Sequence, residues 1–189
     1  MATKTNVAQM ENGINITQMT NTVEAIKATP SLAKFNFRSS SRWGGGVKSK
    51  AYVKSFYGAG QEDTSRKETF TMEGDEPAVL LGTNTGPNAA EALLSALAGC
   101  LTASFILPAS AQGIKVDSLE FNIDGNVDLQ GFLQLQEGIR PGFQNIRVRA
   151  SVKADASRQK IQEIFDHAVK TSAVMDTIRN PVPVSVELA

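Results

Sequence analysis

Asn88–Leu107 reads NAAEALLSALAGCLTASFIL and is the longest apolar stretch of the chain. Leu93, Leu97, Cys100 and Ser104 recur at helical spacing within it and therefore share one face of a predicted helix. Asn88, followed by Glu91 three residues later, fits the capping-box pattern of a helix start, with Asn in place of Ser or Thr. We expect Pro108 to end or kink this helix near Ile106 and Gly113 to close the segment.

Cys100 is the only cysteine of the chain, and it lies on this helix. Free cysteine is among the most buried residue types, so the thiol is interpreted first as a small core residue. The other interpretation is a nucleophile held by a rigid helix, and helix position alone leaves both open.

The rest of the chain alternates between strand and helix patterns. An amphipathic helix is predicted around Ile16–Ile26, before Pro30, and a second one over residues 157–170, with an apolar stripe of Ile161, Ile164, Phe165 and Ala168. Strands are predicted where apolar and polar residues alternate, Gly44-Gly45-Gly46 is predicted as a hairpin turn, and residues 58–68 are predicted as a loop. The predicted strands are 34–38, 51–56, 69–72, 116–129, 145–153 and 182–188.

This order predicts an α+β fold with antiparallel sheets around a long central apolar helix. That helix is apolar nearly all round, more than a surface helix requires, so we expect an intertwined homodimer to bury it. Residues 1–15 are polar and expected to be loose. We expect residues 1–30 to form an N-terminal extension with a short amphipathic helix, and residues 31–189 to form a single domain.

Composition excludes several classes of function. The chain has 189 residues, 19 basic and 19 acidic, so we expect neither a nucleic-acid partner nor a membrane surface. One cysteine cannot form an internal disulfide, and residues 1–6 lack the hydrophobic core of a secretory signal, so a cytoplasmic location is expected. The apolar helix contains Glu91 and several hydroxyl side chains, which argues against a membrane span.

The usual signatures of bound metals and cofactors are missing from the sequence. His167 is the only histidine, and it lies away from the apolar stripe of its helix, so we expect a solvated residue. The sequence has neither a Walker-type loop nor a dinucleotide fingerprint. We therefore expect no cofactor and no metal.

Several segments resemble the OsmC-like proteins, which include the organic hydroperoxide resistance proteins. The first is NAAEALLSALAGCL, residues 88–101, which is similar to the cysteine helix of that family. The resemblance covers residues 33–188 in order. Its other segments are RWGG (42–45), FYGAGQEDTSR (56–66), GNVDLQGFL (125–133), RPGFQNI (140–146) and NPVPV (180–184).

The resemblance implies a fold and a chemistry. It implies a homodimer whose two central helices pack between sheets, with the active sites at the interface. It also implies reduction of organic hydroperoxides by two thiols, the first of which becomes a sulfenic acid and condenses with the second. Cys100 matches the first thiol, and Arg42 is the candidate for an arginine that activates it.

The chain departs from the family pattern at two positions. Ser172 stands where the second thiol is expected. The activating glutamate lies ten residues before the first cysteine, which is Ala90 here. Glu91, one place later, is kept as a candidate, although one residue rotates the side chain by about a hundred degrees around a helix.

Two hypotheses follow from these departures. In the first, Cys100 alone reduces a small organic hydroperoxide, Arg42 stabilises its thiolate, and an external thiol resolves the sulfenic acid. In the second, the protein is not catalytic and binds a small apolar ligand in the dimer cleft, with Cys100 as part of the wall.

Overall fold

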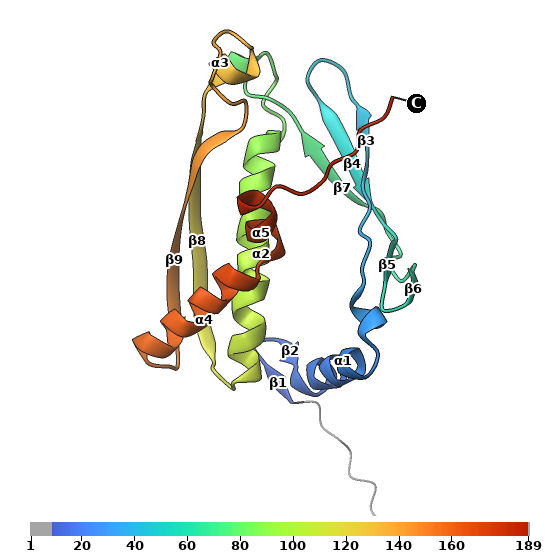
Figure 1. The fold of residues 1–189 in the computed structure, drawn as a ribbon, viewed down its shortest axis with the longest axis vertical. Helices are drawn as coiled ribbons and strands as arrows, with labels where there is room; N and C mark the ends of the chain where they lie inside the picture. The colour runs from blue at the N-terminus through green and yellow to red at the C-terminus, as the bar shows by residue number, and fades with distance from the viewer. Residues whose placement is uncertain (1–8, 189) are drawn as a thin grey trace, which may run out of the picture. The chain divides into compact units, whose positions relative to one another are not determined.

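A computed structural model describes residues 9–188, which form two compact units (Figure 1). Within the described residues, unit 1 comprises Gln9 and residues 15–92, and unit 2 comprises residues 10–14 and 93–188. The fold is α+β with antiparallel sheets and a long helix, as expected. The single domain expected over residues 31–189 stays a prediction.

Part of the N-terminal segment expected to be loose is ordered. Residues 1–8 lie outside the described part of the chain, but β1 (Met10–Glu11) and β2 (Ile14–Asn15) form a hairpin. Asn12 and Gly13 take positive φ angles of 48° and 78° at its turn, which an Asn-Gly pair adopts readily. Short local hairpins of this kind depend on turn residues more than on alternation, which is why the polar composition was misleading.

The Asn12 side chain attaches this hairpin to the rest of unit 2. Its amide nitrogen donates to the Ser110 hydroxyl at 3.0 Å and to the Ile114 carbonyl at 2.8 Å. Its amide oxygen accepts from the backbone N–H of Val116 at 2.8 Å.

Unit 1 begins with α1 (Ile16–Ala28), the predicted amphipathic helix, and its N-cap Asn15 accepts from the N–H of Gln18 at 2.9 Å. A short 3₁₀ turn at Pro30–Ala33 follows. The strand predicted at 34–38 is wrong, because only Asn36 pairs there, in an isolated bridge to Tyr57. The loop predicted at 58–68 contains part of a hairpin of β5 (Phe56–Gly58) and β6 (Gln61–Asp63).

The main sheet of unit 1 has the order β3–β4–β7 and is antiparallel. Its strands are β3 (Ser40–Trp43), β4 (Ser49–Val53) and β7 (Phe70–Gly74). The predicted glycine turn is confirmed, since Gly44 donates its N–H to the Lys48 carbonyl at 2.9 Å. Pairing of Ala51 with Met72 places apolar side chains on one face, and pairing of Lys50 with Glu73 places charges on the other.

The loop before the long helix is organised by Asp75, a buried carboxylate. Its oxygens accept hydrogen bonds from the backbone N–H of Glu76 and from the N–H and hydroxyl groups of Thr83 and Thr85, at 2.7–3.1 Å. Burial acts to raise the pKa of Asp75, but these hydrogen bonds outweigh it and hold the pKa well below its usual range. The loop, which includes a 3₁₀ turn at Ala78–Leu80, is thereby held in one conformation ahead of Asn88.

The long helix is α2 (Ala89–Ala111). The predicted capping box is confirmed: Asn88 Oδ1 accepts from the Glu91 N–H at 2.9 Å, and the Glu91 carboxylate accepts from the Asn88 N–H at 2.8 Å. Pro108 was expected to end or kink the helix near Ile106; an end there is wrong, because the helix continues through Pro108. Ala109 and Ser110 are buried beyond the proline, and their packing keeps this last turn helical despite the lost hydrogen bond.

Gly113 closes α2 as predicted. It takes a left-handed φ of +67°, and the N–H of Ile114 donates to the Ala109 carbonyl at 3.0 Å. By length and composition, α2 is also apolar enough to cross a membrane, with a mean hydropathy of 1.9, so its polar residues alone do not argue against a span. Core helices of folded proteins have the same properties, and one face of α2 is buried in unit 2.

Unit 2 packs α2 and α4 against one face of a long two-stranded sheet (Figure 1). The strands are β8 (Val116–Val127) and β9 (Phe143–Ala154), joined through α3 (Leu129–Phe132), and they confirm the strands predicted at 116–129 and 145–153. Phe121 pairs with Ala150, which places their apolar side chains on one face. The helix α4 (Arg158–Thr171) buries the predicted stripe. The buried core consists of Phe105, Ala109, Ile114, Ile164 and Ala168.

The C-terminal part of unit 2 differs from the expectation. A short helix, α5 (Ala173–Arg179), follows α4 directly. Residues 182–188 alternate apolar and polar residues but form no strand in this chain, and Val184 and Val186 are 78% and 87% exposed. Alternation indicates a face that suits a sheet, but it supplies no partner strand.

Candidate functional site

Cys100 lies in unit 2, midway along α2, and is half-buried. Leu97 and Leu101, on either side of it along the helix, are completely buried. Ser104 lies one turn further on, so its hydroxyl is on the same face as the thiol. The rigid helix therefore holds the thiol at the edge of the core, not in its middle.

Ser172 forms the junction between α4 and α5. Its backbone N–H donates to the Ala168 carbonyl at 3.0 Å, which ends α4. Its hydroxyl oxygen accepts from the N–H of Met175 at 3.3 Å, which caps α5. The side chain is completely buried. Since the hydroxyl oxygen already accepts the capping bond, its own hydrogen is available to donate to the sulfur of Cys100.

The surroundings of Cys100 favour its thiolate. Burial acts to raise the pKa of the Cys100 thiol, but four hydrogen-bond donors outweigh it, and the pKa is lowered. The donors are the hydroxyl of Ser172, the backbone N–H groups of Val174 and Ala173, and the hydroxyl of Ser104. A thiolate is the nucleophilic form of cysteine, so the site has the electrostatics that an attacking sulfur needs.

The structure thus brings together two of the four residues selected from the sequence, Cys100 and Ser172. Both lie in unit 2, and the Ser172 hydroxyl acts to lower the pKa of the Cys100 thiol. Its assignment as the site of a lost thiol stays a prediction.

Glu91 has another role in the structure. Its carboxylate caps the first turn of α2. Nine residues separate it from Cys100, which corresponds to about 13.5 Å along the axis and about half a turn around it. Glu91 is therefore directed to the opposite side of α2 from the thiol, because nine residues turn its side chain about half a turn away from Cys100.

Arg42 lies in unit 1, on β3. Its guanidinium is 5.7 Å from the centre of the Tyr52 ring on the neighbouring strand, a cation–π distance. Its predicted role at the thiol stays a prediction. His167 is exposed on α4, as predicted.

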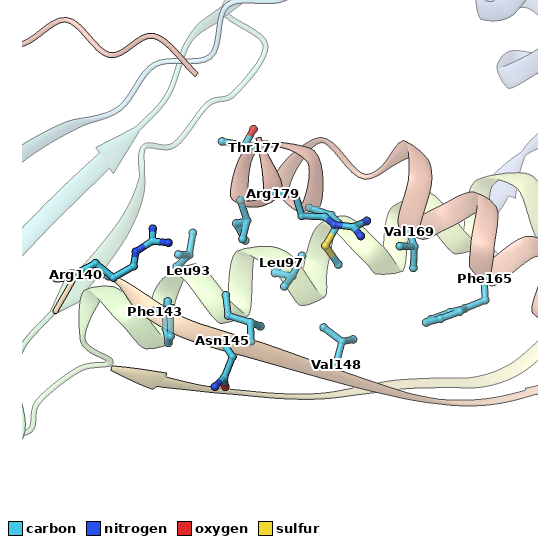
Figure 2. Close-up of a pocket in the computed structure, with 14 residues that line it drawn as sticks. Leu93, Leu97, Arg140, Phe143, Asn145, Val148, Phe165, Val169, Thr177 and Arg179 are labelled. Atoms are coloured by element: carbon cyan, nitrogen blue, oxygen red, sulfur yellow. The ribbon is translucent and has the colours of Figure 1, made fainter. Parts of the chain in front are cut away.

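A pocket of about 780 Å³ lies beside the cysteine site in unit 2 (Figure 2). Leu93 and Leu97 of α2, Val148 of β9 and Ile178 of α5 contribute to its mostly apolar wall. The cysteine site and the pocket share α2 and α5, because Ala173 and Val174 bond the sulfur while later residues of α5 line the pocket.

Sequence reasoning missed the α5 donors. Backbone N–H groups are identical in every residue except proline, so their role depends on where a helix begins. One signal was present: Ser172 is a good N-cap, and Val174, Met175 and Ile178 follow it at helical spacing. This pattern predicts a short helix whose first N–H groups lie next to Ser172.

Comparisons with known proteins bear on the family and the fold of the chain. A sequence model described as OsmC-like protein matches residues 82–187. No curated protein matches the chain. The solved structures that resemble it include an OsmC-like protein from Mycoplasma pneumoniae, with 18% identity, a TM-score of 0.59, and coverage of 77% of this chain and 89% of that one.

Two further solved structures are similar at lower scores. A putative osmotic stress induced and detoxification response protein from Psychrobacter arcticus 273-4 has 15% identity and a TM-score of 0.56, over 76% of this chain and 88% of that one. An organic hydroperoxide resistance protein OsmC from Legionella pneumophila has 14% identity and a TM-score of 0.52, over 76% and 89%. At these identities the likeness shows the fold.

Proposed function

The chain belongs to the OsmC-like protein family, and from this we propose that it reduces organic hydroperoxides through the single thiol of Cys100. The family match covers the whole of α2 and every residue that bonds the sulfur. A similar solved structure is named for organic hydroperoxide resistance, which supports hydroperoxide as the substrate class.

The observation that carries the proposal is the set of donors around Cys100, a half-buried thiol at the edge of the core, which lower its pKa although burial acts to raise it. Four donors converge on the sulfur although it is the only cysteine in the chain and forms no disulfide. A cysteine that only fills core volume is an inert thiol in apolar surroundings, where burial raises the pKa. The convergence of donors favours the nucleophile over the core residue.

The proposed reaction is balanced with one protein thiol and two external ones. The thiolate attacks the terminal oxygen of the hydroperoxide, the O–O bond breaks, and the alkoxide leaves and takes up a proton as the alcohol. Cys100 is oxidised to a sulfenic acid. An external thiol condenses with it and releases water, and a second external thiol reduces the mixed disulfide, which restores Cys100.

The direct test is consumption of cumene hydroperoxide in the presence of a small dithiol. We expect wild type to consume it catalytically and Cys100→Ser to fall to the background rate, with little loss of stability because Ser is close to Cys in size. Equal rates for the two proteins would reject the proposal. The binding function, in which Cys100 is a wall residue of a cleft for an apolar ligand, would then replace it.

We further propose that Ser172 occupies the position of a lost second thiol. Its side chain bonds the Cys100 sulfur, so a cysteine there would lie within disulfide range, which requires Cα atoms no more than about 7 Å apart. After brief peroxide treatment, Ser172→Cys should lose both free thiols without a covalent dimer on a non-reducing gel. Two thiols that stay free would show that the assignment is wrong.

Exposed apolar side chains support the proposal of a homodimer. Trp43 and Met72 on the apolar face of the unit 1 sheet are 79% and 58% exposed, and the apolar residues of 182–188 are unpaired in this chain. Exposed apolar patches of this kind mark interaction surfaces. We expect an interface larger than about 2,000 Å² in total, as in obligate dimers. Sedimentation of a folded monomer at micromolar concentration would contradict it.

A further inference from the structure

The pocket beside the cysteine site is elongated and mostly apolar. It lies wholly within unit 2, between α2, β9, α4 and α5. Figure 2 shows Leu93 and Phe143 toward one end and Phe165 and Val169 toward the other. Its volume of about 780 Å³ is within the range of sites that enclose small organic ligands, roughly 300–1,000 Å³.

Two arginines give this pocket a positive charge that its own walls do not balance. Arg140 and Arg179 both line it, whereas none of its lining residues is acidic. Neither guanidinium has an ion pair among residues 9–188, although Arg38 and Arg147 elsewhere each pair with a carboxylate. Figure 2 shows Arg140 at the Phe143 end and Arg179 further along, over the middle of the pocket.

We propose that this pocket binds a ligand with an apolar chain that ends in a small oxyanion. The apolar wall suits a hydrocarbon chain. The affinity of such a ligand for the pocket grows with the apolar surface that binding removes from water. The guanidinium groups supply paired N–H donors that match the oxygens of a carboxylate or a phosphate monoester. This function goes beyond peroxide reduction, because no bond of the ligand has to change.

The pocket and the cysteine site share α2 and α5, but no residue that lines the pocket acts on the sulfur. The two sites can therefore be separated by mutation. The arginines are exposed, so their replacement should leave the fold intact, and Cys100 does not line the pocket. Ligand binding should therefore survive Cys100→Ser. Failure of the peroxide reaction and failure of ligand binding can in this way be told apart.

The test is calorimetric titration with decanoate below its micellar concentration, with decanol as the uncharged control. We expect decanoate to bind more tightly than decanol, and octanoate to bind up to about fifteenfold more weakly than decanoate, from the loss of two methylenes. Decyl phosphate is the third probe. Tighter binding of either anion than of decanol supports the proposal, and the better of the two identifies the head group.

Variants then locate the head group. Arg140→Gln and Arg179→Gln are each made, and we expect at least one of them to weaken decanoate about three- to tenfold, as befits an exposed charge pair with paired hydrogen bonds. Arg158→Gln, on α4 but outside the pocket lining, is the matched control and should bind as wild type does. The affinity for decanol should be the same in all three.

Three results would overturn the proposal. Decanol that binds as tightly as decanoate would show that charge is not recognised. Arginine variants that bind decanoate as the Arg158→Gln control does would show that binding is elsewhere. No heat of binding from any probe would show that the pocket does not take a chain with an oxyanion at its end.

Discussion

Phe105 and Cys100 lie little more than one turn apart on α2, yet their surroundings differ in kind. Phe105 is 1% exposed and packs among Ala109, Ile164 and Ala168, with apolar contacts throughout. Cys100 is half-buried, and its sulfur is bonded by hydroxyl and backbone N–H groups from Ser172 and the start of α5. One helix thus supplies a packing site and a polar thiol site, and the difference comes from the segments that face it.

The largest effect is expected in the packing site. Phe105→Ala should lower the free energy of unfolding by about 3–5 kcal/mol, because the lost contacts leave a cavity in a core of few residues. Thr102→Ala, on an exposed position of the same helix, is the matched control and should change it by no more than about 0.5 kcal/mol. Denaturant unfolding at one fixed protein concentration measures both. Similar losses for both variants would contradict the division of α2 into two regions.

A smaller loss of stability, with a change in chemistry, is expected in the thiol site. Ser172→Ala removes the N-cap of α5 and should cost about 0.5–2 kcal/mol. It also removes a donor to the sulfur, so the pKa of Cys100 should rise and the pH profile of its alkylation should move to higher pH.

Ser157→Ala separates these two effects. Ser157 caps α4 through the N–H of Lys160 at 3.2 Å, so its loss costs a similar cap without a thiol contact. We expect comparable destabilisation and an alkylation profile like that of wild type. A profile that moves equally in both variants would show that the thiol responds to general loosening and not to the Ser172 hydroxyl.

The smallest effect is expected for Ser104→Ala. Ser104 makes the weakest of the hydrogen-bond contributions to the lowered pKa of Cys100. The alkylation profile should therefore move in the same direction as in Ser172→Ala but by less, with a stability change within about 0.5 kcal/mol. A larger shift than that of Ser172→Ala would reverse the order of the donors.

Much of the packing site was predictable from sequence. The apolar period fixes the stripe of α4, and alternation identifies the inner faces of β8 and β9, because burial follows residue type along regular elements. The path of α2 through Pro108 was not predictable, since tertiary packing there overrides a local preference. The alternation of residues 182–188 likewise indicates an apolar face that suits a sheet, but it does not identify a strand with which these residues would pair.

The thiol site was predictable only in part. Cys100 and Ser172 were selected by resemblance, and the structure brings their side chains together. The N–H groups of Ala173 and Val174 were missed, because every residue except proline has the same backbone N–H and the sequence does not show which of them act as donors. The capping role of Glu91 was predictable, since a capping box is a local pattern.

The most direct test of the account is whether the folded protein activates Cys100 toward hydroperoxide. Wild-type protein is exposed briefly to cumene hydroperoxide with dimedone as a sulfenic-acid trap, and its intact mass is measured in the native state and in denaturant. We expect one dimedone adduct, on Cys100, which forms faster in the native protein than in the unfolded chain, because only the fold supplies the donors that lower the pKa of the thiol. Adduct formation that is no faster in the native protein, or a native thiol that stays unmodified, would contradict it.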